Sequence, residues 1–224
     1  MKKMMKKMSA LFAGVLLVGT LTACAEQFDA SAYVKAILDN SYYNDSTGIV
    51  ELGIGTAEEA SAIYEEGIDA QMDAMLDETV VISDELYNEY RQFYIDLYSS
   101  VKYTVGEAVE VDDETFEVTV TYEKMNMFEE AVVAYEAVIV DYVTAWTEAV
   151  LAGEEAPSDE EMTEVLFAAL KDCMVAELAD ATYDEPATAT IRVELVDNVW
   201  TPNEEDLLNL EYLLFDFEGL YELQ

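Results

Sequence analysis

Histidine is absent from this chain of 224 residues, and basic residues are scarce. Without histidine there can be no Ser-His or Cys-His nucleophile pair and none of the usual zinc sites. Lysine and arginine together number 10 against 49 aspartates and glutamates, which gives a net charge of −39. Such a field repels phosphate backbones, so we expect no nucleic-acid partner. It favours a cationic ligand or a basic protein as partner, although acidity also keeps a surface protein soluble.

Cysteine is also scarce, with only Cys24 and Cys173 in the chain. Cys173 lies in the apolar stretch 170–178 and is expected to pack in the interior of a helical region. If Cys24 carries a lipid, Cys173 has no partner for an internal disulfide.

The first 23 residues have the three parts of a secretory signal. Four lysines precede Met8, an uncharged apolar run covers 8–19, and small residues follow up to Cys24. The run is too short for a bilayer span, which needs about 20 residues. We therefore expect residues 1–23 to be a signal peptide, with a signal cut elsewhere or an uncleaved anchor as the alternatives.

The stretch Leu21-Thr22-Ala23-Cys24 resembles the lipobox of bacterial lipoproteins, in which an aliphatic residue and two small ones precede a cysteine. The resemblance implies lipid attachment at the Cys24 thiol, cleavage after Ala23 and fatty acylation, such as palmitate, of the new amino terminus. A thiolate is the soft nucleophile that suits this step. Two or more acyl chains hold a protein stably on a membrane. The implied location is the extracytoplasmic face of the cell membrane.

Residues 24–30 would then form a short lipidated tether, and residues 31–224 a single α+β extracytoplasmic domain. Removal of the four leader lysines from a chain of net charge −39 leaves −43. The apolar content of 52% is sufficient for a core. A weak repeat of helix and hairpin, at 86–122 and 162–200, leaves two small subdomains as the alternative.

Two stretches alternate apolar and polar residues with a period of two, and each predicts an antiparallel hairpin. The first covers 103–122 and the second 189–200, with a turn at Asp197-Asn198. The fold class is therefore α+β, with a four-stranded antiparallel sheet and about five to six helices packed mainly on one face. Residues 40–55 carry turn residues and predict a loop. The helices are expected at 29–43, 56–77, 83–100, 128–152, 158–181 and 203–215.

The helix at 128–152 is expected to lie in the core. Its apolar residues step by four and three from Phe128 through Trp146 to Ala149. Glu136 and Asp141 interrupt the apolar stretch, so we do not interpret it as a membrane span.

Clusters of carboxylates are the obvious candidates for chemistry, but each one begins a predicted helix. Acids in a first turn complement the helix dipole by about 0.3–1 kcal/mol each. We therefore expect no catalytic, cofactor-binding or metal-binding residue and no cofactor. An irregular oxygen site in the loop 44–54 stays open, although its residues do not match an EF-hand. The clusters are Glu58-Glu59, Asp84-Glu85, Asp159-Glu160-Glu161 and Glu204-Glu205-Asp206.

Aromatic residues and one arginine offer two further candidates. Among 15 tyrosines and 2 tryptophans, most lie at core spacing, which favours packing over sugar binding. Arg192 could hold a ligand carboxylate, but a cross-strand ion pair is the preferred interpretation. The tyrosines that fall off the apolar stripes are Tyr42, Tyr43, Tyr87 and Tyr94.

The runs 28–34 and 102–106 resemble uncharacterised lipoproteins of Gram-positive bacteria, whose domains have no assigned function. The resemblance brings no catalytic residues. The expected role is a lipid-anchored, non-catalytic module that binds a ligand or a partner. One alternative is a histidine-free hydrolase that uses a carboxylate pair on cell-wall or glycan substrates. The other is a structural surface protein.

Replacement of Cys24 by alanine should release the protein from the membrane or leave its leader uncleaved, because no thiol remains to take the lipid. Membrane and soluble fractions compared by immunoblot, with apparent mass as the second readout, test this. Cys173→Ala is the matched control and should leave fractionation unchanged. Normal processing and membrane retention of Cys24→Ala would rule out the lipid anchor.

Overall fold

A computed structural model of the chain describes residues 28–76 and 80–216, which form two compact units. Unit 1 comprises 28–75, 98–124 and 184–214, and unit 2 comprises 76, 80–97, 125–183 and 215–216. The signal peptide 1–23 and Cys24 lie outside the described residues. The single-domain organisation expected from the sequence stays a prediction.

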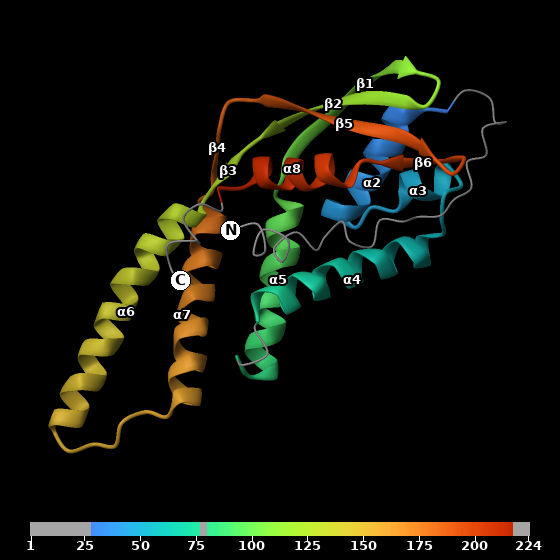
Figure 1. The fold of residues 1–224 in the computed structure, drawn as a ribbon. Coiled ribbons are helices and arrows are strands. Elements are labelled where there is room, and N and C mark those ends of the chain that lie inside the picture. The colour runs from blue at the N-terminus through green and yellow to red at the C-terminus, as the bar shows by residue number, and fades with distance from the viewer. Residues whose placement is uncertain (1–27, 77–79, 217–224) are drawn as a thin grey trace. The chain divides into compact units, whose positions relative to one another are not determined.

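Unit 1 is built on a four-stranded antiparallel sheet of order β1-β2-β5-β6 (Figure 1). The predicted hairpins are β1 with β2 and β5 with β6, and the two hairpins join along β2 and β5. The α+β class and the four-stranded antiparallel sheet are confirmed. The strands are β1 (Lys102–Asp112), β2 (Thr115–Glu123), β5 (Ala187–Val196) and β6 (Val199–Pro202).

One face of this sheet is buried, as the period of two requires. Val118, Val120, Ile191 and Val193 are each 0% exposed, whereas the threonines that alternate with them face outward. Helices α2 (Ala30–Tyr43) and α8 (Glu204–Leu214) contact the sheet and lie on the same side of it (Figure 1). Burial of such side chains stabilises the fold by about 1.5–3 kcal/mol each.

The outer end of β1 departs from the predicted alternation. An unbroken alternation over 103–122 would place Val109 and Val111 on the inner face with Tyr103 and Val105, but they are 61% and 55% exposed. The register between β1 and β2 shifts between Val105 and Ala108 because β1 contains one extra residue there. An extra residue moves the side chains that follow it, Val109 among them, to the opposite face, and the register shifts a second time between Glu110 and Asp112.

The predicted loop at 40–55 contains a short helix, α3 (Thr47–Glu51), which the sequence did not indicate. Gly48 allows α3 to lie against α2, because a Cβ at this position would come within 2.8 Å of the Ala36 Cβ. The next helix, α4 (Ala57–Met75), begins with a capping box. The Glu59 N–H donates to the Thr56 hydroxyl at 3.2 Å, and the Thr56 N–H donates to the Glu59 carboxylate at 2.9 Å.

Unit 2 contains most of α5 and a long helical hairpin. Helices α6 and α7 lie side by side and are joined by residues 152–158 (Figure 1). At the base of the hairpin, two strands of two residues pair with each other, too short to leave a sequence pattern. The elements are α5 (Asp84–Ser99), α6 (Phe128–Leu151), α7 (Asp159–Ala179), β3 (Met125–Asn126) and β4 (Thr182–Tyr183).

Only the first turns of α6 are buried, so its expected role as a core helix is wrong for most of its length. Phe128, Val132 and Tyr135 are at most 9% exposed, but Tyr142 is 38% exposed. The core between α6 and α7 is small, with Tyr135, Ala169 and the predicted packing residue Cys173 at its centre. No helix in the described residues is both long and apolar enough to cross a membrane.

The start of α6 receives its cap from a residue far along the chain. The carboxylate of Asp216 accepts the N–H groups of Met127, Phe128 and Glu129 at 3.4, 3.2 and 3.5 Å. The first N–H groups of a helix have no partner within the helix, and a carboxylate also complements the dipole. The N-cap residue itself, Met127, supplies no side-chain hydrogen bond.

Replacement of Ile191 by alanine should lower the free energy of unfolding by roughly 2–5 kcal/mol, because it opens a cavity in the sheet core. The neighbouring Thr190 faces outward, and Thr190→Ala should change the free energy by less than about 0.5 kcal/mol. Urea unfolding followed by circular dichroism measures both. Equal effects of the two substitutions would contradict the assignment of the faces.

Candidate functional site

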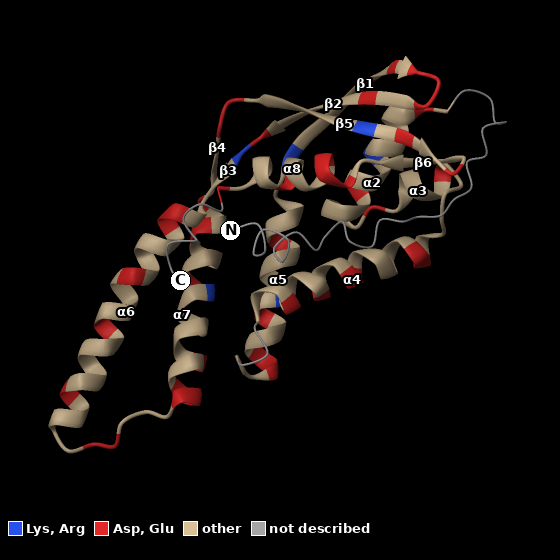
Figure 2. Ribbon diagram, in the orientation of Figure 1, with Lys and Arg blue, Asp and Glu red and all other residues tan. Residues whose placement is uncertain are grey.

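The acidic clusters lie in the first turns of α4, α5, α7 and α8, as predicted. Asp and Glu are spread over the helices and strands of both units and do not gather at one point (Figure 2). Within residues 28–76 and 80–216, no three His, Cys, Asp or Glu side chains are placed to hold a metal ion. In the segment 44–54, the Thr47 side chain and the Thr47 N–H, the latter at 2.9 Å, donate to the Asp45 carboxylate and lower the pKa of Asp45.

Arg192 forms an ion pair, but with a helix and not with the neighbouring strand, so the expected cross-strand pair is wrong. Its Nε and Nη2 donate to the two carboxylate oxygens of Asp206 in α8, at 2.7 and 2.9 Å. Glu117 stands opposite Arg192 on β2, yet the planar guanidinium matches the Asp206 carboxylate in bidentate fashion. These hydrogen bonds raise the pKa of Arg192. The guanidinium is therefore engaged within the fold.

The four tyrosines that fall off the stripes contribute to packing. Tyr42 is 0% exposed in the core of unit 1. Tyr43 stacks on Tyr103, with ring centroids 5.4 Å apart and an angle of 6° between the planes. Tyr87 and Tyr94 are half-buried on α5. No exposed pair of rings from this set offers a platform for a sugar.

One buried acid, Glu211, was missed by the sequence analysis. It lies in α8 at 2% exposure, and its Oε1 accepts the Tyr98 hydroxyl at 3.2 Å. Burial, with the Glu211 charge as a second cause, raises the pKa of Tyr42. The position of Glu211 among Leu207, Leu210 and Leu214 in the sequence is the signal that could have indicated its burial. These aromatic and apolar neighbours indicate a structural role.

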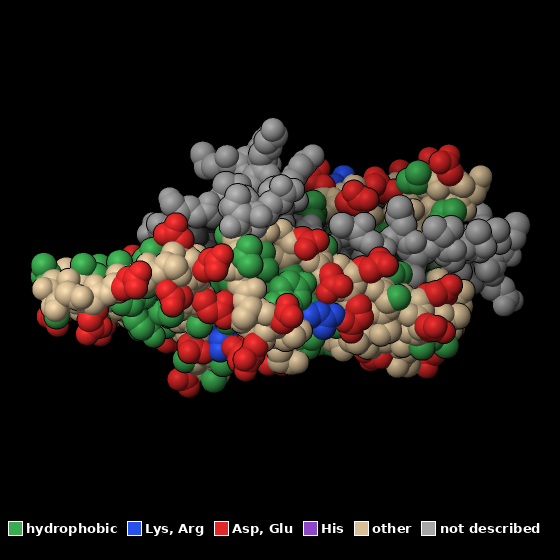
Figure 3. Space-filling view, turned by 90° about the horizontal axis from the view of Figure 1, so that it is seen from below, with side chains coloured by type: hydrophobic (Ala, Val, Ile, Leu, Met, Phe, Trp, Pro, Cys, Tyr) green, Lys and Arg blue, Asp and Glu red, His purple; other side chains and the backbone are tan. Residues whose placement is uncertain are grey.

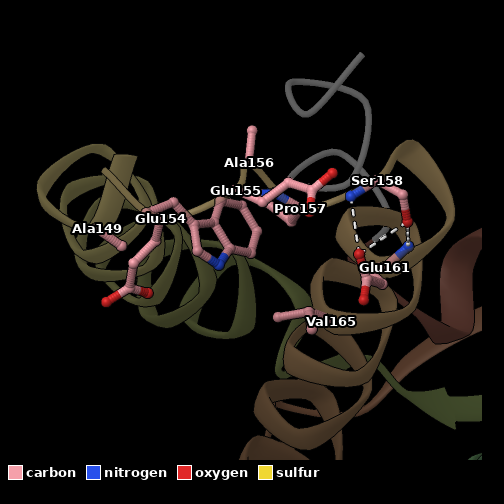
Figure 4. A pocket seen from close by; sticks show the side chains of 9 residues that line it. Ala149, Glu154, Glu155, Ala156, Pro157, Ser158, Glu161 and Val165 are labelled. Carbon is pink, nitrogen blue, oxygen red and sulfur yellow. Dashed lines mark hydrogen bonds between the residues drawn. The ribbon is translucent and has the colours of Figure 1, made fainter. Parts of the chain in front are cut away.

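A hollow of about 850 Å³ lies at the far end of the α6–α7 hairpin (Figure 4). This volume falls in the range of small-molecule sites. Glu154 lies on the side of α6, and Ser158 and Glu161 lie on the side of α7 (Figure 4). The lining residues are Trp146, Ala149, Glu154, Glu155, Ala156, Pro157, Ser158, Glu161 and Val165.

The end of α6 positions the first part of the lining. The Gly153 N–H donates to the Val150 carbonyl and the Glu154 N–H to the Ala149 carbonyl, both at 3.0 Å. This is the Schellman pattern, and it requires a left-handed residue, which Gly153 supplies with φ +95°. The motif ends the helix sharply and sets Glu154 at the edge of the hollow.

The start of α7 positions the opposite side of the hollow's lining through a capping box. The Ser158 hydroxyl accepts the Glu161 N–H at 3.2 Å, and the Glu161 carboxylate accepts the Ser158 N–H at 2.8 Å. The Ser158 N–H, together with the Ser158 hydroxyl, which donates to the same carboxylate at 2.9 Å, lowers the pKa of Glu161. Glu161 therefore carries its negative charge at neutral pH, and its side chain has a defined position.

The hollow combines an aromatic ring with three carboxylates and no base. Trp146 is half-buried, and its ring stacks on Tyr142 with centroids 5.8 Å apart. The hairpin 128–179 contains 13 acids and one base, Lys171, which is paired with Glu89 at 2.9 Å and with Asp172. An indole face and carboxylates together suit an organic cation, through cation–π attraction and charge-assisted hydrogen bonds.

Sequence reasoning missed this site because Trp146 has the spacing of a core residue. The spacing is correct, since Trp146 faces α7 like Tyr135 and Ile139 before it. The acidic pair Glu154-Glu155, which follows Trp146 at the end of the same predicted helix, was the sequence signal that could have indicated this site. Comparison with known families, with curated proteins and with solved structures gives no match for this chain.

Replacement of Ser158 by alanine should raise the pKa of Glu161 toward its ordinary value, because the hydroxyl partner is lost. A pKa lowered by folding stabilises the fold at a pH above the ordinary glutamate value, and this contribution is lost as the pH falls through the folded-state pKa. In Ser158→Ala this contribution should therefore be smaller, and its loss should be complete at a higher pH. Carboxylate carbon shifts in an NMR pH titration measure it, and Glu59 in the other capping box should be unchanged. An unaltered Glu161 titration would contradict the assignment.

Proposed function

We propose that the protein is a lipid-anchored extracytoplasmic module that binds a cationic partner without catalysing a reaction. The observation that carries this proposal is the hollow at the end of the α6–α7 hairpin, where Trp146 lies with Glu154, Glu155 and Glu161 and no base. A ligand of positive charge meets attraction from every charged group in the lining. An anionic ligand would meet only repulsion.

The chemistry of the lining specifies the cation further. An indole face favours a soft or alkylated cation, and a tryptophan is the strongest aromatic partner. Three carboxylates favour several N–H donors distributed along a chain. A polyamine, or the lysine and arginine side chains of a basic protein, combines these properties.

Binding fits the exposure of these acids better than catalysis does. A carboxyl group that acts as a general acid at neutral pH is usually sheltered in apolar surroundings. Glu154 and Glu155 are exposed, and Glu161 is held by Ser158. The carboxylates therefore suit the role of fixed negative charges.

The lipid expected at Cys24 supports the same role. A mature chain of net charge −43 is repelled by anionic headgroups within a Debye length of about 8 Å. Acyl chains on Cys24 would hold the protein at the surface against this repulsion. The anchor would keep the binding module at the membrane, where the secreted cationic partner would reach it.

Spermidine should change the indole fluorescence of residues 25–224, a chain that retains every described residue. The change should be absent from Trp146→Phe, which keeps Trp200. Glu154→Gln with Glu155→Gln should weaken binding about tenfold. At constant ionic strength, Trp146→Ala should weaken it roughly 2- to 30-fold, the range expected for a cation–π contact.

The matched control is Glu204→Gln with Glu205→Gln, an exposed acidic pair at the start of α8 that does not line the hollow. It should change the dissociation constant by less than about twofold. If both double variants weaken spermidine equally, the attraction is only that of the net charge and the site is wrong. Turnover of a cell-wall or glycan substrate by the same chain would contradict a non-catalytic role.

A further inference from the structure

The face of α6 opposite its buried residues carries an apolar stripe that no other described element covers. Its members follow one another by four and three residues, the spacing of a coiled-coil seam. All of them are exposed, and Val133, Val140 and Leu151 reach 63%, 63% and 82%. We name this set the outer stripe: Val133, Ala137, Val140, Thr144, Thr147 and Leu151.

The two threonines do not make the outer stripe polar. The Thr144 hydroxyl donates to the Val140 carbonyl and the Thr147 hydroxyl to the Val143 carbonyl, both at 2.7 Å. Each hydroxyl is satisfied by its own helix and leaves its methyl group for a neighbour. The outer stripe is therefore uncharged and apolar over three heptads.

The positions that flank the outer stripe carry acids, valines and one alanine. Asp141 and Glu148 occupy one side, and Glu136, Val143 and Val150 occupy the other. In a coiled coil these flanking positions determine which helix can pair with which. No base stands on either side, and none occurs anywhere in α6. At the end of the α6–α7 hairpin, at the left of the space-filling view, hydrophobic side chains lie beside acidic ones (Figure 3).

This charge pattern selects among the occupants of an apolar helix face. A second copy of the chain would place acid against acid in either orientation, which is destabilising. A helix that lies in a lipid interface carries lysines and arginines on its polar side, where α6 carries acids. A helix with basic flanks meets attraction at Glu136, Asp141 and Glu148 together with the apolar seam.

We propose that the outer stripe binds an amphipathic helix of another protein, with lysine or arginine at the positions beside its apolar seam. This inference rests on the proposed function, since it specifies the cationic partner as a basic helix. Trp146 faces α7 and the outer stripe faces away from it, so the hollow and the outer stripe are separate surfaces of one hairpin. Substitutions on one surface can therefore be tested independently of the other.

The test uses two labelled peptides of about 21 residues, three heptads, which have the same apolar seam. One carries lysine and the other glutamate at the flanking positions. Residues 25–224 should bind the lysine peptide at least about tenfold more tightly. Val140→Glu should weaken that binding about tenfold or more, whereas Val109→Glu, on the equally exposed outer end of β1, should change it less than about twofold.

Charge reversal provides the most specific result. Asp141→Lys with Glu148→Lys should exchange the preference, so that the glutamate peptide binds more tightly. Equal losses from Val140→Glu and Val109→Glu, or an unchanged preference after reversal, would overturn the inference. So would binding of phosphatidylcholine vesicles through the outer stripe, or self-association that Val140→Glu abolishes.

The result also separates this inference from the proposed function. If the lysine peptide responds to Trp146→Ala and not to Val140→Glu, the hollow is the site and the outer stripe is not. If it responds to Val140→Glu while spermidine binds nowhere, the outer stripe stands and the hollow fails. If neither substitution affects any cationic probe, both proposals are wrong.

Discussion

The pairing of β2 with β5 is the interaction on which the rest of unit 1 depends. It joins two hairpins that lie far apart in the sequence, from Thr115 opposite Glu194 to Tyr122 opposite Ala187. The cost of closing a flexible loop grows slowly with length, by about 0.6 kcal/mol for each doubling. The whole segment 124–186 can therefore be accommodated between the two strands. Where the chain leaves and returns, the Asp184 N–H donates to the Lys124 carbonyl at 2.9 Å.

A second constraint is the shortage of bases. With 10 lysines and arginines for 49 acids, most carboxylates cannot be paired with a cation. Several are instead held by backbone N–H groups at helix starts, as Asp29, Glu59, Glu161 and Asp216 are. This arrangement stabilises the helices but leaves the net charge uncompensated. Surfaces such as the end of the α6–α7 hairpin are consequently negative throughout.

The periodicity of the sequence was sufficient for the class of fold, for both hairpins and for the long helices, because burial on one face imposes a period of two or of about 3.6. It failed where a single residue or a distant contact decides the outcome. A bulge in β1 turned Val109 outward, and Gly48 allowed α3 to pack. Spacing also cannot show where a helix runs beyond its core, which is why Trp146 was placed inside. The partner of Arg192 depended on where α8 docks, which no local pattern records.

The cap that Asp216 provides has a consequence for the order of assembly. A ribosome completes α6 and α7 before it reaches residue 216. The N–H groups at the start of α6 therefore have no Asp216 carboxylate to bind until β5, β6 and α8 have been synthesised. The hairpin therefore emerges from the ribosome before the residue that caps it, and it is completed only after α8 has been made. Whatever holds the nascent chain in the meantime must tolerate an exposed, acidic and unfinished pair of helices.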